Sequence, residues 1–139
     1  MSWVFLVHLF SSLFMCGLCW FVQIVHYPLF LVIRPEDFPR YEQKNFVTAY
    51  LTVPIMTIEL STGLYLLYLD QSFWLWLNLA LLGIIALSTA FFQVPMHLRL
   101  MKEVNPPLIK KLIRTNWIRT IAWTLRMIIM WVLLNPSAT

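Results

Sequence analysis

The sequence predicts an all-α membrane protein, an antiparallel bundle of four transmembrane helices. Of its 139 residues, 60% are apolar and only 12% are charged, a composition outside the range of soluble domains. The apolar residues form four continuous runs, each close to the roughly 20 residues that an α-helix needs to cross a bilayer. A membrane β-barrel would instead show alternating strands. The short connections make successive helices antiparallel neighbours.

The four spans fill nearly the whole chain, which leaves a single domain. We expect them at about residues 3–33, 45–69, 73–97 and 112–134. No basic residue precedes the first run and no small-residue cleavage site follows it, so we expect a span there rather than a signal peptide. Polar, turn-rich segments separate the runs at 34–39, 70–72 and 105–107.

The basic residues predict the orientation of the helices. Eight of them lie in or beside the first and third connections: Arg34, Arg40, Lys44, Arg99, Lys102, Lys110, Lys111 and Arg114. The other side of the bundle carries none. By the positive-inside rule both basic loops are cytoplasmic, and both termini face the periplasm or the outside of an inner (plasma) membrane. The net charge of +4 thus reflects topology and anionic lipid headgroups, not a nucleic-acid partner.

Two charged residues lie deep within the predicted spans, Glu59 in the second and Arg126 in the fourth. Either charge alone would cost at least about 2.5 kcal/mol at the membrane centre. Both helices run outward from the cytoplasm, and the two residues lie at similar distances from Lys44 and Arg114, so they reach similar depths. We therefore predict a buried Glu59–Arg126 ion pair, which could be catalytic or could be a clamp that fixes helix register.

Other polar residues recur at helical spacing, so each span is expected to have one polar face. The first and third spans approach the cytoplasm as the second and fourth leave it, so polar residues far apart in sequence meet at similar depths. These residues define a predicted site in the cytoplasmic half, next to the deeper ion pair: His26, Gln93, His97, Asn116 and Arg119. Arg119 could instead extend to the headgroups. His26 and Tyr27 could simply mark an interfacial helix end.

Metal and redox chemistry are less well supported by the pattern. His26 and His97 are candidate ligands for a transition metal or a haem, but their predicted depths differ, and the chain lacks the Glu-x-x-His pairs of di-iron bundles. Bends at Pro28 and Pro95 could reduce that difference. Cys16 and Cys19 have the spacing of redox motifs, yet they lie within a span, away from aqueous thiols.

Four segments carry a resemblance that covers almost the whole chain: Val25–Phe30 (VHYPLF), Phe38–Glu42 (FPRYE), Gln93–His97 (QVPMH) and Arg114–Arg126 (RTNWIRTIAWTLR). In these segments the chain resembles a family of small uncharacterised bacterial four-span membrane proteins. More distantly it is similar to the anthrone oxygenase-like membrane proteins, whose characterised members oxidise hydrophobic aromatic compounds. The resemblance implies a four-helix fold and an oxidoreductase activity, and it assigns no catalytic residue.

Two classes of function follow. In an enzyme or cofactor-binding protein for a lipophilic small molecule, Arg119 and Arg126 would stabilise an anionic oxygen. Glu59 would be a general base or charge partner, and His26 and His97 would transfer protons or bind metal. Gln93 and Asn116 would complete a cofactor or ligand site. In a small carrier, Glu59 would bind a proton or cation, although a fixed Arg partner would hold it ionised. An accessory subunit and a homo-oligomer stay open as alternatives.

Overall fold

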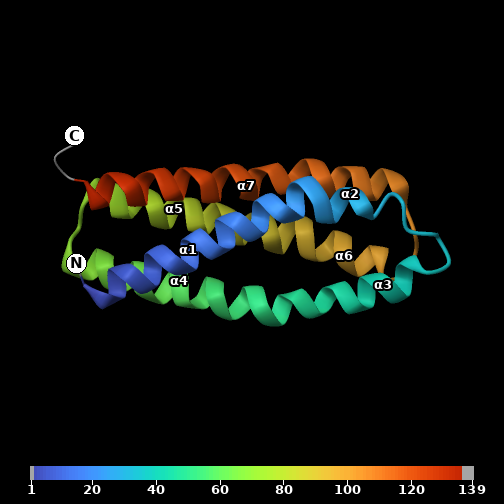
Figure 1. The fold of residues 1–139 in the computed structure, drawn as a ribbon, viewed down its shortest axis with the longest axis horizontal. Helices are drawn as coiled ribbons and strands as arrows, with labels where there is room; N and C mark the ends of the chain where they lie inside the picture. The colour runs from blue at the N-terminus through green and yellow to red at the C-terminus, as the bar shows by residue number, and fades with distance from the viewer. Residues whose placement is uncertain (1, 136–139) are drawn as a thin grey trace.

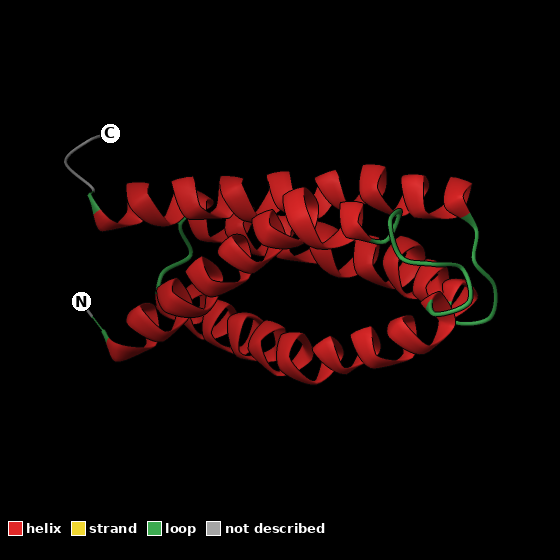
Figure 2. Ribbon diagram, turned by 45° about the vertical axis from the view of Figure 1, so that its right-hand side comes forward, coloured by secondary structure: helices red, strands yellow, loops and turns green. Residues whose placement is uncertain are grey.

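The computed structural model describes residues 2–135 as four long helices lying side by side (Figure 1). All four are long and apolar enough to cross a membrane: Trp3–Leu29, Phe38–Leu69, Phe73–Leu100 and Pro106–Leu134. No strand occurs between residues 2 and 135, and the connections between helices are short (Figure 2). The predicted fold class is confirmed, and the chain is a multi-pass integral membrane protein.

Three of the long helices are composed of shorter elements. The first contains α1 (Trp3–Phe21), the π-helical η1 (Val22–His26) and α2 (Tyr27–Leu29). The second contains α3 (Phe38–Asn45), the 3-10 turn η2 (Phe46–Thr48) and α4 (Ala49–Leu69). The third contains α5 (Phe73–Ser88), the π-helical η3 (Thr89–Gln93) and α6 (Val94–Leu100), and the fourth is α7 (Pro106–Leu134). We call the end with connections 30–37 and 101–105 the basic end, and the opposite end, with residues 2, 70–72 and 135, the terminal end (Figure 1).

Polar residues fix where three of the helices begin. The side chains of Ser2, Ser72 and Asn105 each accept a hydrogen bond from the backbone N–H three residues further on, at 3.2, 3.4 and 3.0 Å. Such N-caps satisfy donors that the first helical turn leaves unpaired. Pro106 and Pro107 follow Asn105 in the first turn, where a missing N–H has no cost.

The π-helical segments η1 and η3 occupy corresponding places in the first and third helices, each ending two residues before a proline, Pro28 or Pro95. A proline removes one helical hydrogen bond and crowds the preceding turn, which a wider turn relieves. In the third helix the buried residues follow at intervals of three or four along α5, but of five from Ser88 to Gln93. The extra residue rotates everything beyond it, including His97, by about 100°.

The helices do not end where the apolar runs end. The second helix begins at Phe38 rather than at about residue 45, so part of the expected cytoplasmic loop is the helix α3. Its inner face carries Phe38 and Glu42, both fully buried and one turn apart. The first helix ends at Leu29, before residue 33, whereas the third continues to Leu100 and the fourth starts already at Pro106. A polar segment can extend a helix where one face of that segment packs against the other helices.

The four helices form a ring in which α1 and α5 each pack against both α4 and α7. The buried apolar core follows the bundle axis in three clusters. At the basic end it contains Tyr27, Phe30, Phe38, Met96, Leu100, Ile109 and Leu112. The middle cluster contains Met15, Cys19, Ile85, Ala122 and Trp123, and the terminal one Leu66, Leu67 and Leu75. The many large apolar side chains left exposed face outward, as expected where lipid is the solvent.

Candidate functional site

The polar residues of the interior form two separate groups. The Arg126 cluster consists of His8, Ser12, Glu59, Thr62, Asn78 and Arg126. The Glu42 cluster, nearer the basic end, consists of His26, Tyr27, Glu42, Asn45, Gln93 and His97. Trp123 touches both regions, because its indole N–H donates to Glu59 while its ring borders the cavity beside the Glu42 cluster.

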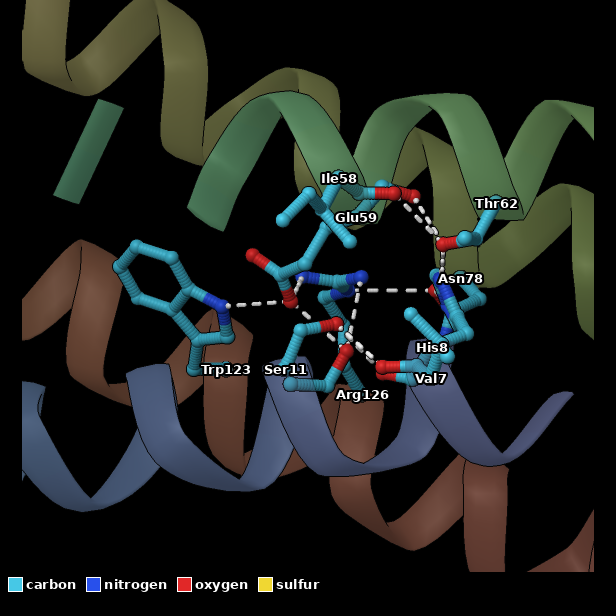
Figure 3. A network of polar contacts seen from close by, with 10 residues as sticks. Val7, His8, Ser11, Ile58, Glu59, Thr62, Asn78, Trp123 and Arg126 are labelled. Atoms are coloured by element: carbon cyan, nitrogen blue, oxygen red, sulfur yellow. Dashed lines mark hydrogen bonds and ion pairs between the residues drawn. The ribbon is translucent and has the colours of Figure 1, made fainter. Parts of the chain in front are cut away.

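The predicted Glu59–Arg126 ion pair is present, with Arg126 Nη1 2.7 Å from Glu59 Oε1 and both side chains 0% exposed (Figure 3). Arg126 also donates from Nε to Asn78 Oδ1 at 3.2 Å and from Nη2 to Ser12 Oγ at 3.3 Å. Glu59 Oε1 further accepts from Ser12 Oγ at 2.7 Å and from the Trp123 N–H at 3.3 Å. The two charges are therefore held in one arrangement by side chains from all four helices.

Close packing seals the Arg126 cluster on its terminal side. His8 lies 2.9 Å from Thr62 Oγ1 through Nδ1 and 3.3 Å from Asn78 Oδ1 through Nε2. A Cβ atom at Gly63 would lie 2.8 Å from Leu79 Cδ2 and 3.1 Å from His8 Cε1, so a larger residue here would require both side chains to shift. His8 thus forms interhelical hydrogen bonds to the second and third helices.

The centre of the Glu42 cluster is a fully buried carboxylate. Glu42 Oε1 is paired with His97 Nδ1, and Glu42 Oε2 accepts a hydrogen bond from Asn45 Nδ2 at 3.3 Å. On its other side, His97 Nε2 lies 2.9 Å from the hydroxyl of Tyr27. Asn45 Oδ1 accepts in turn from His26 Nε2 at 2.7 Å. Both histidines are thus connected to one carboxylate, directly or through one amide.

The Glu42 cluster borders a cavity of about 180 Å³ lined by α1, η1, α2, the end of α3, η2, the start of α4, η3, α6 and α7. Its polar lining includes His26, Tyr27, Asn45, Gln93, His97 and Arg119. Most of the remaining wall is apolar, with Met15, Leu18, Met56 and Trp123 among its residues. Some lining residues, such as Leu51 and Val53, are also exposed on the outer surface, so the cavity can be reached from the lipid.

Arg119 borders this cavity without a carboxylate partner among residues 2–135. Its guanidinium carbon lies 5.5 Å from the centre of the Trp123 ring, a cation–π contact. Its Nε is buried and has no hydrogen-bond partner within the described chain. Of the two alternatives for Arg119, the structure places it at the interior cavity rather than at the headgroups. A guanidinium with an unused buried donor favours a ligand that carries an anion or an acceptor.

Four of the predicted site residues line the cavity: His26, Gln93, His97 and Arg119. Asn116, which was grouped with them, faces α1 instead and donates from Nδ2 to Gln23 Oε1 at 2.9 Å. It does not line this cavity, because its position on α7 turns it toward the α1–α7 contact.

Glu59 and Arg126 line neither this cavity nor the groove described below. They pair as predicted, but in a sealed part of the bundle, so no ligand in the cavity would reach them without displacing Trp123.

The predicted site did not include Tyr27, Glu42 or Asn45. Glu42 lies in a segment that was expected to be a cytoplasmic loop. Basic residues stand on both sides of it there, so its carboxylate gave no sign of a buried position. The spacing of Phe38, Glu42 and Asn45 at intervals of four and three is helical, and this was the available signal. Tyr27, for which an interfacial helix end was one interpretation, is 5% exposed and its hydroxyl lies within hydrogen-bond distance of His97.

The residues present do not fit a haem. Both ring nitrogens of His97 and one of His26 are already hydrogen-bonded, and the cavity of about 180 Å³ is smaller than the roughly 300 Å³ at which pockets for drug-sized ligands begin. No group of three or more His, Cys, Asp or Glu side chains placed to hold a metal ion occurs in residues 2–135. Cys16 and Cys19 are free thiols in the structure, and Cys19 Sγ lies 3.4 Å from Thr120 Oγ1.

Comparisons with protein-family models, with curated proteins and with solved structures find no match for this chain.

Proposed function

We propose that the protein is a membrane enzyme that binds a lipophilic phenol or enolisable ring in the cavity and removes a proton from it. The observation that carries the proposal is the hydrogen-bonded series of Tyr27, His97 and Glu42, which leads from the cavity wall to a buried carboxylate. A general base held by a third, charged group is the arrangement used in many proton-transfer enzymes.

The geometry suggests how the proton moves. With the Tyr27 hydroxyl donating to His97 Nε2, the other ring nitrogen carries a proton and donates to Glu42. A substrate hydroxyl can then give its proton to the Tyr27 oxygen while the proton of Tyr27 passes to His97. The imidazolium that forms is stabilised by the adjacent carboxylate of Glu42. The proton therefore ends beside a negative charge that is already in place.

Arg119 supplies the complementary charge on the substrate side. A substrate oxygen that loses its proton becomes an anion. The guanidinium of Arg119 borders the same cavity, has no carboxylate partner in the described chain, and can pair with this anion. Fixed charges at a cavity shielded from water stabilise such an anion more than they would in solution. The cation–π contact with Trp123 holds the guanidinium at the cavity wall.

The size of the cavity limits the part of the substrate that it can hold. Its volume of about 180 Å³ is close to the roughly 150 Å³ of an engineered apolar cavity that binds benzene. A single ring with one or two small substituents therefore fits. An aromatic substrate is also what the resemblance to the anthrone oxygenase-like proteins implies.

The alternative functions explain less of what the interior contains. A carrier would need Glu59 to bind and release its ion, yet Glu59 Oε1 accepts from Ser12, Trp123 and Arg126 in a sealed cluster. An accessory role would account for the ion pair as a clamp but leaves the cavity and Arg119 without a purpose. With the basic loops in the cytoplasm, the cavity lies in the cytoplasmic half of the membrane.

The proposal can be tested with 4-ethyl-2-nitrophenol, whose absorption band moves to longer wavelength in the visible when the phenol is ionised. Added to the detergent-purified protein below the pKa of the free probe, it should become partly ionised on binding. Arg119→Gln should lower both binding and ionisation, whereas Arg114→Gln, on the exposed side of α7, should change neither. Tyr27→Phe should lower the ionised fraction more than the bound amount. Tyr50→Phe serves as its control, because the Tyr50 side chain is 81% exposed on the outer surface.

One result would contradict the proposal. If the probe shows the same ionised fraction with the wild type, Arg119→Gln and Tyr27→Phe proteins, then any ionisation comes from the detergent surface and the cavity is not a proton-transfer site.

A further inference from the structure

A second feature of the molecule is an apolar groove of about 720 Å³ between α4 and α5 on the lipid-facing side. Its lining runs from Val53 to Leu67 on α4 and from Trp76 to Val94 in the third helix. At about 1.5 Å per residue the second stretch is roughly 27 Å long, close to the thickness of the hydrocarbon core of a bilayer. The groove thus follows the bundle axis across most of the membrane.

The walls of this groove are almost entirely apolar. The two hydroxyl groups in its lining, Thr57 and Thr89, donate to backbone carbonyls of their own helices at 2.9 and 2.8 Å. The space comes from small residues on one side of α5 and η3: Ala80, Gly83, Ala86 and Ala90. A Cβ atom at Gly83 would meet nothing within 4 Å. Such a wall can bind a hydrocarbon chain.

The groove begins where the cavity ends, because Val53, Met56, Thr89 and Val94 line both. A molecule with its ring beside Arg119 can therefore leave the cavity between α4 and η3 and continue along the groove toward the terminal end. A helix from a second copy of this chain would instead cover the mouth of the cavity at Val53 and Val94.

We infer that the groove holds the hydrocarbon tail of the same molecule whose ring occupies the cavity, so that the substrate is a ring-headed lipid with one long alkyl or isoprenoid tail. This inference rests on the proposed function. Lipid tails surround the bundle in any case, so the groove gains no hydrophobic free energy by filling. Its contribution is shape: a tail lying between α4 and α5 points the oxygen-bearing ring toward Tyr27 and Arg119.

The experiment compares two probes and two variants. The probes are 4-ethyl-2-nitrophenol and 4-tetradecyl-2-nitrophenol, and the variants are Gly83→Leu, which fills the groove, and Gly17→Leu, on α1. A Cβ atom at Gly17 also meets nothing within 4 Å, and Gly17 lines neither the cavity nor the groove, so the two substitutions are matched. Gly83→Leu should weaken binding of the tetradecyl probe about tenfold, the effect of a typical steric clash, and leave the ethyl probe unchanged. Gly17→Leu should bind both like the wild type.

A second measurement uses the wild-type protein alone. A tetradecyl probe with a photoreactive diazirine at the tail end should crosslink to residues in the middle of the groove, such as Leu60, Leu64 and Leu79. Crosslinks spread over all lipid-facing helices would overturn the inference, as would equal binding of the tetradecyl probe by the two variants. A loss of dimers in Gly83→Leu with unchanged probe binding would assign the groove to a second copy. If the ethyl probe does not bind the wild type, the proposed function itself fails, and this inference with it.

Discussion

Replacing Arg126 by Met should lower the free energy of unfolding by about 3–5 kcal/mol, the usual cost of leaving one member of a buried ion pair without its partner. The structure supports the upper part of that range. Both side chains are 0% exposed, and the substitution removes hydrogen bonds to Glu59, Asn78 and Ser12 together. Glu59 would keep only Ser12 and Trp123 as donors, and neither is charged.

Glu59→Gln should have a cost of similar size, because Arg126 then keeps its charge in the interior with only neutral partners. The double variant removes both charges, so its loss should be smaller than the sum of the single losses by about 2 kcal/mol, within the range measured for residues in contact. Unfolding by a denaturing detergent in mixed micelles, followed by Trp fluorescence, gives all four free energies. Arg114→Met, on the exposed side of α7, is the control and should be nearly neutral.

The reasoning would be refuted if the two losses added to within about 0.5 kcal/mol, since that is the behaviour of independent sites. A neutral Arg126→Met variant would be equally decisive, because it would mean that Glu59 is protonated or solvated in the folded protein.

Three further predictions concern other parts of the bundle. Glu42→Gln should lower the ionised fraction of bound 4-ethyl-2-nitrophenol and leave the bound amount unchanged, because the histidine beside it loses its counter-ion; an unchanged absorption band would contradict the relay. Gly63→Ala should destabilise the bundle by about 1–3 kcal/mol through overpacking, whereas Gly17→Ala, with open space around it, should not. A cysteine at Lys102 should be labelled by a membrane-impermeant reagent only after lysis, and one at Asp70 in intact cells; the reverse pattern would invert the orientation.

The fold could be predicted because the bilayer imposes it. Lipid offers no hydrogen bonds to the backbone, so long apolar runs must be helices, and short connections leave few ways of arranging them. The Glu59–Arg126 pair was also predictable, since two isolated charges at similar depth in one small bundle have few other partners. In both cases the alternative, an unpaired backbone group or an unpaired charge in lipid, has a large free-energy cost that can be estimated from the sequence.

The Glu42 cluster depends on features that hydropathy does not record. Helix α3 continues the second span through a polar segment, and a boundary based on apolar runs excludes Glu42. The π-helical η3 shifts the face on which His97 lies, so its contact with Glu42 does not follow from a uniform period of 3.6 residues. For Asn116, helical spacing predicts the polar face of α7 on which it lies. Spacing alone does not predict which neighbouring helix that part of the face contacts.

The separation of the two clusters has a structural basis in the regularity of the helices. The Arg126 cluster lies where all four helices are regular α-helices, packed so closely at Gly63 that a methyl group there would require Leu79 and His8 to shift. The cavity lies beside η1 and η3, where the first and third helices contain wider turns before Pro28 and Pro95. The sealed half can hold helix register while the irregular half leaves room for a ligand. Substitutions at the cavity wall should therefore change binding without unfolding the bundle, which is the condition that makes the tests on Tyr27 and Arg119 informative.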